Sequence, residues 1–331
     1  MKLNKTELSK LIHNALSCEF DENERLRIKR FTKSQLKSYE AEDSLWLTRA
    51  KANATVTLDF ISDSSFLALR FDLYQASSRP FAGFDLYVDG IFYEHRLFKN
   101  FDAKLLTFEL PEGEHRITLY LPWSAETVIN EVHISDGATI QEVKKNKKAL
   151  FLGDSITQGY VTEYSSLSYV ARISGALDIE ALNQGIGGYY FGKNSIDSSL
   201  AEYNPDIIVI AYGTNDYSRN DEMKAFKEDA ESYIEKLTSI FPKTKILAVL
   251  PIYRNDESNK TREKYRKYKL SDAREILKEI YGKYDNVRVI SETGIPRIPD
   301  VFVEDFLHPN ELGFAFMAES IGKEISKCLK D

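Results

Sequence analysis

The stretch ALFLGDSITQGY, residues 149–160, decides how the fold of this chain is interpreted. It begins with the apolar run ALFL, which fits a buried strand, and the run ends abruptly in Gly153, Asp154 and Ser155. In open parallel sheets, ligands bind beyond the carboxyl ends of the strands. Ser155 therefore has two interpretations. It is an ordinary serine at a turn or helix N-terminus, or its hydroxyl is held at the sheet edge to do chemistry.

The rest of the C-terminal half repeats this pattern of an apolar run followed by a helical stretch. Continuous apolar strands that alternate with amphipathic helices indicate a parallel sheet covered on both faces. We therefore predict an α/β fold for this half. The expected strands lie in KALFLGD, IEALNQG, PDIIVIAYG, TKILAVLP and NVRVISE, and the expected helices include residues 164–177, 221–241, 262–282 and 311–329.

Residues 40–140 show a different pattern, in which short runs alternate between apolar and polar side chains and are separated by turn-forming residues. This pattern predicts an antiparallel β-sandwich, of the jelly-roll type. We expect hairpin turns at the dipeptides Asp89-Gly90 and Glu112-Gly113, because glycine tolerates the positive φ of such turns.

The composition changes at the lysine-rich stretch 141–148, which we interpret as a linker. We therefore predict an N-terminal sandwich domain over residues 1–140, with a short amphipathic helix at residues 5–17. The second domain is expected over residues 149–331. At 331 residues, the chain is long enough for two hydrophobic cores.

The charge balance and the cysteine content narrow the range of partners and locations. The formal net charge is −7 and the pI is near 5.5, which argues against a nucleic-acid partner because phosphate binding requires a positive field. No apolar stretch approaches the roughly 20 residues that cross a membrane, and the first residues do not have the pattern of a signal peptide. Cys18 and Cys328 offer no disulfide framework. We expect a protein of the reducing cytoplasm.

A serine nucleophile requires a base within hydrogen-bond reach, a group that orients the base, and donors for the oxyanion. Of the five histidines, only His308 lies in the α/β half, and Asp305 precedes it by three residues. On a single turn, this spacing lets the carboxylate accept the Nδ1 proton and leaves Nε2 for Ser155. The expected oxyanion donors are the N–H groups of Ser155 and Gly188 and the side-chain amide of Asn215.

Several other kinds of site do not fit the sequence. The nucleophile segment lacks the second glycine of G-x-S-x-G, which disfavours an α/β-hydrolase fold. The segment GIGGYY lacks the last glycine of a dinucleotide fingerprint, and GDSITQG has no Walker lysine. With one histidine and no cysteine cluster in this half, we predict neither a metal nor a cofactor. Four residues beside the expected site either line a substrate pocket or serve packing and capping: Asp154, Tyr189, Tyr190 and Tyr217.

Four segments of the α/β half, GDSIT, NQGIGG, GTND and DFLH, occur in the order of the sequence blocks of the SGNH (GDSL-type) hydrolase family, which this half resembles. The resemblance implies a flavodoxin-like three-layer α/β/α fold and esterase, lipase or acyl-hydrolase activity without a metal. Carried over block by block, it places the nucleophile on Ser155, the oxyanion donors on Gly188 and Asn215, and the Asp-x-x-His pair on Asp305 and His308.

The segment GFDLY, residues 83–87, resembles the GxDLY motif, which names a β-domain that precedes some SGNH hydrolases. Many two-domain members of that group are carbohydrate deacetylases, so the resemblance implies an acetyl-preferring esterase acting on a carbohydrate or glycoside. A lipase or thioesterase, an acyltransferase and a non-catalytic glycan-binding protein are the alternatives. We expect the sandwich to shape the cleft or to mediate homo-oligomerisation.

Overall fold

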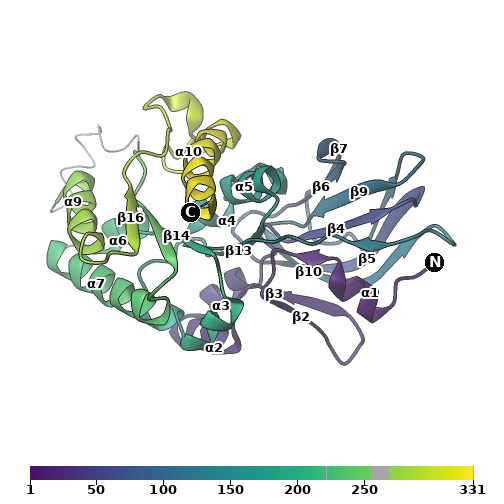
Figure 1. Cartoon of the computed structure of the whole chain (residues 1–331), viewed down its shortest axis with the longest axis horizontal. Coiled ribbons are helices and arrows are strands. Elements are labelled where there is room, and N and C mark those ends of the chain that lie inside the picture. The colour runs from purple at the N-terminus through teal and green to yellow at the C-terminus, as the bar shows by residue number, and fades with distance from the viewer. Residues whose placement is uncertain (221, 255–267, 331) are drawn as a thin grey trace.

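The computed structural model describes residues 1–220, 222–254 and 268–330. Figure 1 shows two halves side by side, with the antiparallel sheets of the N-terminal half on the right and the α/β half on the left. The predicted fold class, an antiparallel sandwich followed by a three-layer α/β/α unit, is confirmed. The domain boundaries stay a prediction.

The two sheets of the sandwich share one apolar core. Along strands such as Phe66–Gln75, buried and more exposed residues alternate, so one face of the sheet enters the core. The first sheet has the order β1 (Ile12–His13), β4 (Thr57–Ser62), β9 (His115–Tyr120), β6 (Ala82–Val88) and β7 (Ile91–Phe98), with β11 (Gln141–Glu142) paired to β4. The second has the order β2 (Ser17–Phe20), β3 (Leu26–Lys29), β10 (Ala125–Ile134), β5 (Phe66–Gln75) and β8 (Leu105–Glu109).

Two local predictions in the sandwich are wrong. The helix expected over residues 5–17 ends early, because α1 spans only Lys5–Lys10 and the chain then pairs with β4 through β1. Pairing with a strand far along the chain outweighs local helical periodicity here. The second error is the hairpin at Glu112-Gly113. It does not form, because β8 pairs with β5 in one sheet whereas β9 pairs with β4 and β6 in the other.

The hairpin predicted at Asp89-Gly90 is confirmed. Strands β6 and β7 pair on either side of this dipeptide, and its two residues have φ angles of +51° and +77°. Positive φ at both central residues is the signature of a two-residue hairpin turn.

The described part of the C-terminal half is built on a parallel sheet in the order β13-β12-β14-β15-β16. In chain order this is 2-1-3-4-5, the flavodoxin-like order, which places a ligand crevice at the carboxyl ends of β12 and β14. The strands are β12 (Lys148–Gly153), β13 (Glu180–Gly185), β14 (Ile207–Ala211), β15 (Lys245–Val249) and β16 (Val287–Ile290).

Helices cover both faces of this sheet (Figure 1). Helices α5 (Tyr169–Leu177) and α10 (Glu311–Lys330) pack on one face, and α7 (Met223–Ile240) and α9 (Leu270–Tyr281) pack on the other. These helices agree with the predicted helical stretches within the described residues. Residue 221 and the part of the predicted helix 262–282 before residue 268 lie outside them.

Two helices from the N-terminal half complete the second face of the sheet. Helices α2 (Lys33–Glu42) and α3 (Ser44–Ala50) place Tyr39 and Trp46 in the same apolar cluster as Leu182 of β13. Apolar residues are sparse in α2, so the sequence pattern does not predict it. In Figure 1, both helices lie beneath the α/β half, although they precede most of the sandwich in the chain.

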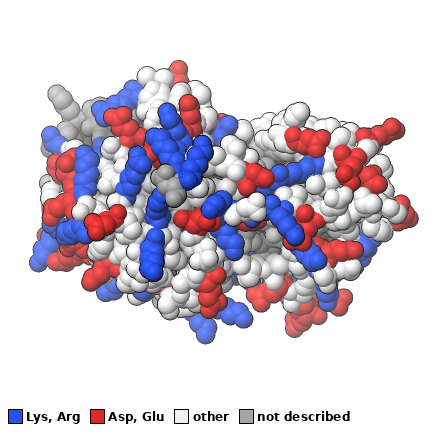
Figure 2. Space-filling model, in the orientation of Figure 1, with Lys and Arg blue, Asp and Glu red and all other residues white. Residues whose placement is uncertain are grey.

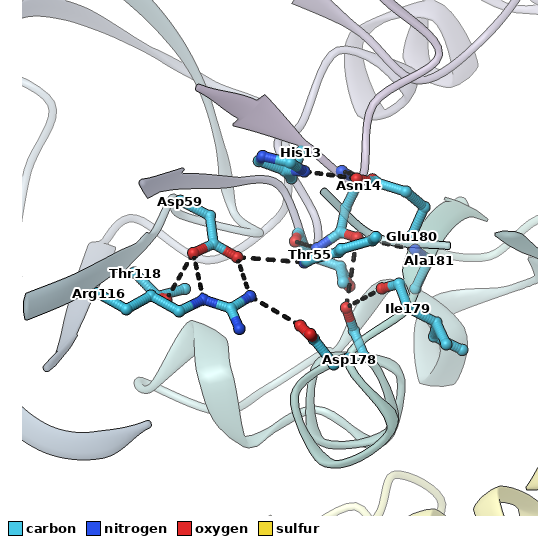
Figure 3. A network of polar contacts seen from close by, with 12 residues as sticks. His13, Asn14, Thr55, Asp59, Arg116, Thr118, Asp178, Ile179, Glu180 and Ala181 are labelled. Atoms are coloured by element: carbon cyan, nitrogen blue, oxygen red, sulfur yellow. Dashed lines mark hydrogen bonds and ion pairs between the residues drawn. The ribbon is translucent and has the colours of Figure 1, made fainter. Parts of the chain in front are cut away.

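A polar network joins the two halves at their boundary (Figure 3). The side-chain amide of Asn14 donates to the Thr55 carbonyl at 3.0 Å, and its oxygen accepts the N–H of Ala181 at 2.7 Å. The neighbouring His13 Nδ1 lies 2.5 Å from a carboxylate oxygen of Glu180. The turn after β1 is therefore bound to the start of β13.

An ionic cluster lies at the same boundary. Arg116 donates to both oxygens of Asp59, at 2.9 and 2.7 Å, and also reaches Asp178 of the α/β half at 2.7 Å. Lys145, in the predicted linker, pairs with Asp59 at 3.3 Å, and the side chains of these two residues are 4% and 1% exposed. A buried carboxylate that serves two cations ties the predicted linker to the sandwich.

On the face shown in Figure 2, basic and acidic side chains are interspersed over both halves of the molecule. Within residues 1–220, 222–254 and 268–330, no helix has the length and apolar character needed to cross a membrane.

Candidate active site

Ser155 begins α4 (Ser155–Gln158) directly after the first strand of the parallel sheet. Asp154 caps this short helix by accepting the N–H of Ile156 at 2.9 Å. Gly153 is required here, because a Cβ at this position would lie 2.1 Å from Thr157 Oγ1. The helix ends at Gly159, whose φ of +99° favours glycine. This tight strand-to-helix connection presents the serine at the carboxyl edge of the sheet.

The structure brings Ser155, His308 and Asp305 into one chain of contacts. Ser155 Oγ lies 2.7 Å from His308 Nε2, and His308 Nδ1 lies 2.6 Å from Asp305 Oδ2. The serine and histidine are 8% and 9% exposed, so their contact is shielded from most of the solvent. The spacing predicted from DFLH therefore has the expected geometry.

Asp305 is held in its ionised form by the same segment. Its Oδ1 accepts the backbone N–H groups of Leu307 and His308, both at 2.9 Å. Partial burial raises the pKa of this carboxyl, but the hydrogen bonds from the His308 side chain and from the two N–H groups outweigh burial and hold the pKa well below its usual range. The carboxylate is thus an acceptor that fixes the imidazole.

The loop after β13 passes close to Ser155 at Gly187, and Gly188 follows. Gly188 has a φ of +81°, and no described residue accepts its N–H. Gln158 accepts the N–H of the preceding Gly187 at 2.7 Å, which fixes the loop. A Cβ built on Gly187 would lie 3.9 Å from Ser155 Cβ, so serine and loop are in close contact.

Asn215 lies next to this loop, in the first turn of α6 (Thr214–Arg219) after β14. Its side-chain amide donates one hydrogen to the Tyr189 carbonyl at 2.9 Å. A primary amide carries two donors, so the second hydrogen is left for another acceptor. The contact places Asn215 against the residue that follows Gly188.

Of the four residues that could line a pocket, Asp154 and Tyr189 serve the core instead. Asp154 is 2% exposed and caps α4, and burial raises the pKa of its carboxyl to about 6. Tyr189 is 1% exposed, and its ring packs edge-on against Tyr39 at 5.1 Å and Trp46 at 5.3 Å. The capping and packing interpretations fit these two residues.

The contacts given for Tyr190 and Tyr217 are likewise with residues other than Ser155. The Tyr190 ring faces the Arg219 guanidinium at 3.7 Å, and the residue lines a separate groove of about 710 Å³ with Glu42. Tyr217 is 8% exposed and packs edge-on against Tyr268 at 5.4 Å.

Asp216 braces the loop that carries Tyr189 and Tyr190. It is 1% exposed, and its Oδ1 accepts the N–H of Phe191 at 2.9 Å. Burial raises the pKa of this carboxyl to about 7. Asp154 and Asp216 are therefore two buried carboxyl groups with raised pKa values, in contrast to the ionised Asp305.

The N-terminal half contributes two arginines that the sequence pattern does not reveal. Arg30 is 2% exposed and donates to backbone carbonyls that include Ala52, Asn183 and Gly185. Burial lowers the pKa of its guanidinium to about 9. Arg49, at the end of α3, donates to the Gly187 carbonyl. The loop that carries Gly188 is therefore held from the N-terminal half.

Tyr160 covers the histidine. Its ring centroid lies 4.6 Å from that of His308 and 5.6 Å from that of Trp123, which is 1% exposed. The sandwich loop before β6 contacts the same ring, since Ser78 Oγ lies 3.1 Å from the Tyr160 hydroxyl and the Arg79 guanidinium lies 5.0 Å from the ring centroid. One wall of the site is thus built jointly by both halves.

The GFDLY segment binds the loop that carries Tyr160. Asp85 is 0% exposed; one of its oxygens accepts the N–H of Ser166 at 2.7 Å and the other lies 2.6 Å from His95 Nδ1. Ser165 donates to the Gly83 carbonyl at 2.8 Å, and Tyr87 donates to the Ser166 hydroxyl at 3.1 Å. The motif that resembles GxDLY therefore anchors residues 160–168 to the sandwich.

A hydroxyl, an imidazole and a carboxylate in contact at the carboxyl edge of a parallel sheet define the arrangement of a serine hydrolase. Residues 151–316, half of the chain, match the family of GDSL-like lipases and acylhydrolases. The chain belongs to this family and is an ester hydrolase. A search of curated proteins by sequence finds no match.

Solved structures share the architecture of both halves. The salicylyl-acyltransferase SsfX3 from a tetracycline biosynthetic pathway has a TM-score of 0.84 at 19% identity, over 99% of this chain and 97% of that one. A candidate GDSL-like lipase from Bacteroides ovatus has a TM-score of 0.77 at 20% identity, over 100% and 98%. A family two carbohydrate esterase from Clostridium thermocellum, in complex with cellohexaose, has a TM-score of 0.65 at 18% identity, over 84% and 94%. At these identities, the likeness shows the fold.

Proposed function

We propose that the chain hydrolyses short acyl esters, acetyl esters above all, through an acyl-enzyme on Ser155. The observation that carries this proposal is the chain of contacts from Ser155 Oγ to His308 at 2.7 Å and from His308 to Asp305 at 2.6 Å. A neutral imidazole in this position can take the serine proton as the hydroxyl attacks the acyl carbonyl.

The proposed reaction has two steps. In the first, Ser155 Oγ bonds to the acyl carbon, His308 Nε2 takes the hydroxyl proton, and the same proton then goes to the alcohol oxygen as its bond to the acyl carbon breaks. In the second, His308 takes a proton from water as the water oxygen adds to the acyl carbon, the ester bond to Ser155 breaks, and His308 returns the proton to Ser155 Oγ as the free acid leaves. Asp305 accepts the Nδ1 hydrogen throughout and stabilises the imidazolium in both steps.

The proposed oxyanion donors are the N–H groups of Ser155 and Gly188 and the second amide hydrogen of Asn215. Their position at one edge of the sheet, and the Gly188 N–H that no described residue accepts, support this role. Removing one such donor from a hydrolase typically costs about a hundredfold to a thousandfold in kcat.

The proposed alcohol part is a sugar or glycoside. The fold shared with a carbohydrate esterase supports this choice, and the burial of Ser155, together with the packing of Tyr160 on His308, favours a small acyl group. Acyl transfer to another acceptor is the second candidate, because the chain shares its fold over nearly its full length with an acyltransferase. We place the protein in the reducing cytoplasm, since Cys18 and Cys328 are both free thiols.

The test is a rate series on p-nitrophenyl acetate, butyrate and octanoate, together with a panel of acetylated sugars, for wild type and Ser155→Ala. We expect the acetate to react fastest and Ser155→Ala to lose at least about a thousandfold in kcat. Ser239→Ala, on the exposed side of α7, is the matched control and should behave as wild type.

The other outcomes each select a different function. A preference for octanoate would replace the proposal with a lipase or thioesterase. An acylated product on an added alcohol, at the expense of free acid, would identify a transferase. Sugar binding without turnover would identify a glycan-binding protein.

A further inference from the structure

The strongest feature outside the proposed catalytic groups is Arg49, which lies beside the loop next to the serine. A Cβ built on Gly187 would lie 3.9 Å from both Ser155 Cβ and Arg49 Cδ, so the serine and the arginine flank the same glycine. A Cβ built on Gly188 would lie 3.0 Å from Arg49 Nη1. The guanidinium is therefore adjacent to the proposed oxyanion donor.

Arg30 and Arg49 are neighbouring arginines with different surroundings. Arg30 is 2% exposed, and its hydrogens are directed at several backbone carbonyls, which is a structural role. Arg49 is only partly buried and donates to the Gly187 carbonyl, while the Trp46 ring lies 5.6 Å from its guanidinium carbon. A guanidinium has five N–H donors, so Arg49 keeps donors for a ligand.

Burial lowers the pKa of the Arg49 guanidinium, and Asp43 acts on its charge only from beyond ion-pair distance. Among the described residues, no carboxylate lies within ion-pair distance of Arg49, or of Arg79 beside the Tyr160 ring. Elsewhere on this chain, arginines such as Arg25, Arg27 and Arg116 pair with aspartates. In a chain of net charge −7, Arg49 beside the serine loop and Arg79 beside the Tyr160 ring supply positive charge that opposes the negative charge of Asp305 near the site.

We propose that Arg49 binds a carboxylate carried by the ester substrate, so that the enzyme prefers acidic esters over neutral ones. Planar guanidinium and carboxylate groups form two parallel charge-assisted hydrogen bonds, which fix the orientation of a bound ester as well as its affinity. Arg79 contacts the Tyr160 ring, which also packs against His308, and adds positive charge at longer range. This inference rests on the proposed ester hydrolysis at Ser155 and names its substrate class.

Two pairs of substrates test the proposal and locate the carboxylate. In 4-acetoxybenzoate the carboxylate lies on the alcohol part, and its methyl ester is the neutral partner. In the 4-nitrophenyl monoester of succinate the carboxylate lies on the acyl part, and the methyl 4-nitrophenyl diester is the neutral partner. Within each pair, the ratio of variant to wild-type kcat/KM removes the intrinsic reactivity of the ester.

The decisive variant is Arg49→Gln, which keeps a donor for the Gly187 carbonyl and loses the charge. We expect kcat/KM to fall by about 10- to 100-fold for the acidic member of one pair, mainly through KM, and by less than about threefold for its neutral partner. Arg70→Gln, an exposed arginine 4.0 Å from Glu131 on the sandwich, is the matched control and should leave both ratios at one. Equal losses on the acidic and neutral esters would overturn the proposal.

A binding measurement separates this proposal from the proposed function. Titration calorimetry of 4-hydroxybenzoate and of succinate into Ser155→Ala requires no turnover. Binding of one of these anions that weakens at least about tenfold in the Ser155→Ala, Arg49→Gln double variant supports the anion site even if the wild type hydrolyses no ester. Equal affinity in the two proteins, or binding of neither anion, overturns the anion site even if hydrolysis is confirmed. Arg49→Lys, which keeps the charge, should retain most of the binding if Arg49→Gln proves unstable.

Discussion

Two of the aspartate–histidine pairs among the described residues have the same contact and different neighbours. Asp305 and His308 lie in the α/β half, Asp85 and His95 in the sandwich, and in each pair Nδ1 lies 2.6 Å from a carboxylate oxygen. Both imidazoles also lie against a tyrosine of the same short loop. The centroid distances are 4.6 Å from His308 to Tyr160 and 4.0 Å from His95 to Tyr164.

The two pairs differ in the third group that each one contacts. The Nε2 of His308 lies 2.7 Å from the Ser155 hydroxyl. In the sandwich, the second oxygen of Asp85 accepts the N–H of Ser166, so that pair holds a loop. In both places the carboxylate fixes the orientation of the imidazole. Only His308 also contacts a hydroxyl, that of Ser155, on which the proposed chemistry depends.

Replacing each histidine by alanine should reveal the largest difference between the two pairs. We expect His308→Ala to lower kcat on p-nitrophenyl acetate by about ten-thousandfold with little change in the thermal midpoint. His95→Ala should reduce kcat by less than about tenfold and instead cost about 1–3 kcal/mol, because it leaves the buried Asp85 short of a partner. Steady-state rates and thermal unfolding of the two variants test this prediction. A large loss of kcat in His95→Ala with a loss of stability alone in His308→Ala would contradict it.

A smaller effect is expected from Asp85→Asn, which weakens the anchor of residues 160–168. As a positioning residue, Asp85 acts through this loop on Tyr160, so we expect kcat/KM to fall by about tenfold. The matched control is Asp89→Asn, because the Asp89–His115 pair has the same 2.6 Å contact while its carboxylate is 53% exposed. Equal kinetic losses in the two variants, or a change in stability alone, would contradict a positioning role for Asp85.

The smallest effect concerns the pH dependence of stability. The pKa of Asp216 is raised, whereas that of Asp305 is lowered. Burial raises the pKa of Asp216 to about 7, so the folded state binds this proton more tightly than the unfolded chain. The stability from this carboxyl is present below about pH 4 and is lost as the pH rises through about 7. In urea unfolding, Asp216→Asn should therefore gain about 1–3 kcal/mol relative to wild type between pH 4 and 8. A constant difference across this range would show that Asp216 is ionised at both ends.

The central contacts of the site can be predicted from the sequence because their signals are local. Ser155 follows an apolar strand within one short segment, and Asp305 and His308 are three residues apart on one turn. The parallel strands bring these segments to the same edge, so the pattern of strands is enough to predict their meeting. The catalytic roles assigned to them stay predictions.

The surroundings of the site could not be predicted in the same way. Arg30 and Arg49 give no periodic signal, and each donates to a carbonyl more than a hundred residues away, Asn183 and Gly187. Tyr189 follows a glycine-rich block in the sequence, yet its ring enters the core because α2 and α3 pack over it. Helix α2 itself has few apolar residues, so only its tertiary partners reveal it.

The contribution of α2 and α3 to the far side of the α/β core has a consequence for how the protein is made. These helices leave the ribosome well before the strand that contains Leu182, and roughly 130 residues of synthesis separate the two. At a synthesis rate of about 5–20 residues per second, Tyr39 and Trp46 are made on the order of ten seconds before the strand that they pack against. During that time, the two helical segments lack the packing partners that they have in the folded protein. Slower translation between residues 50 and 180 should lengthen the interval in which chaperones can bind them.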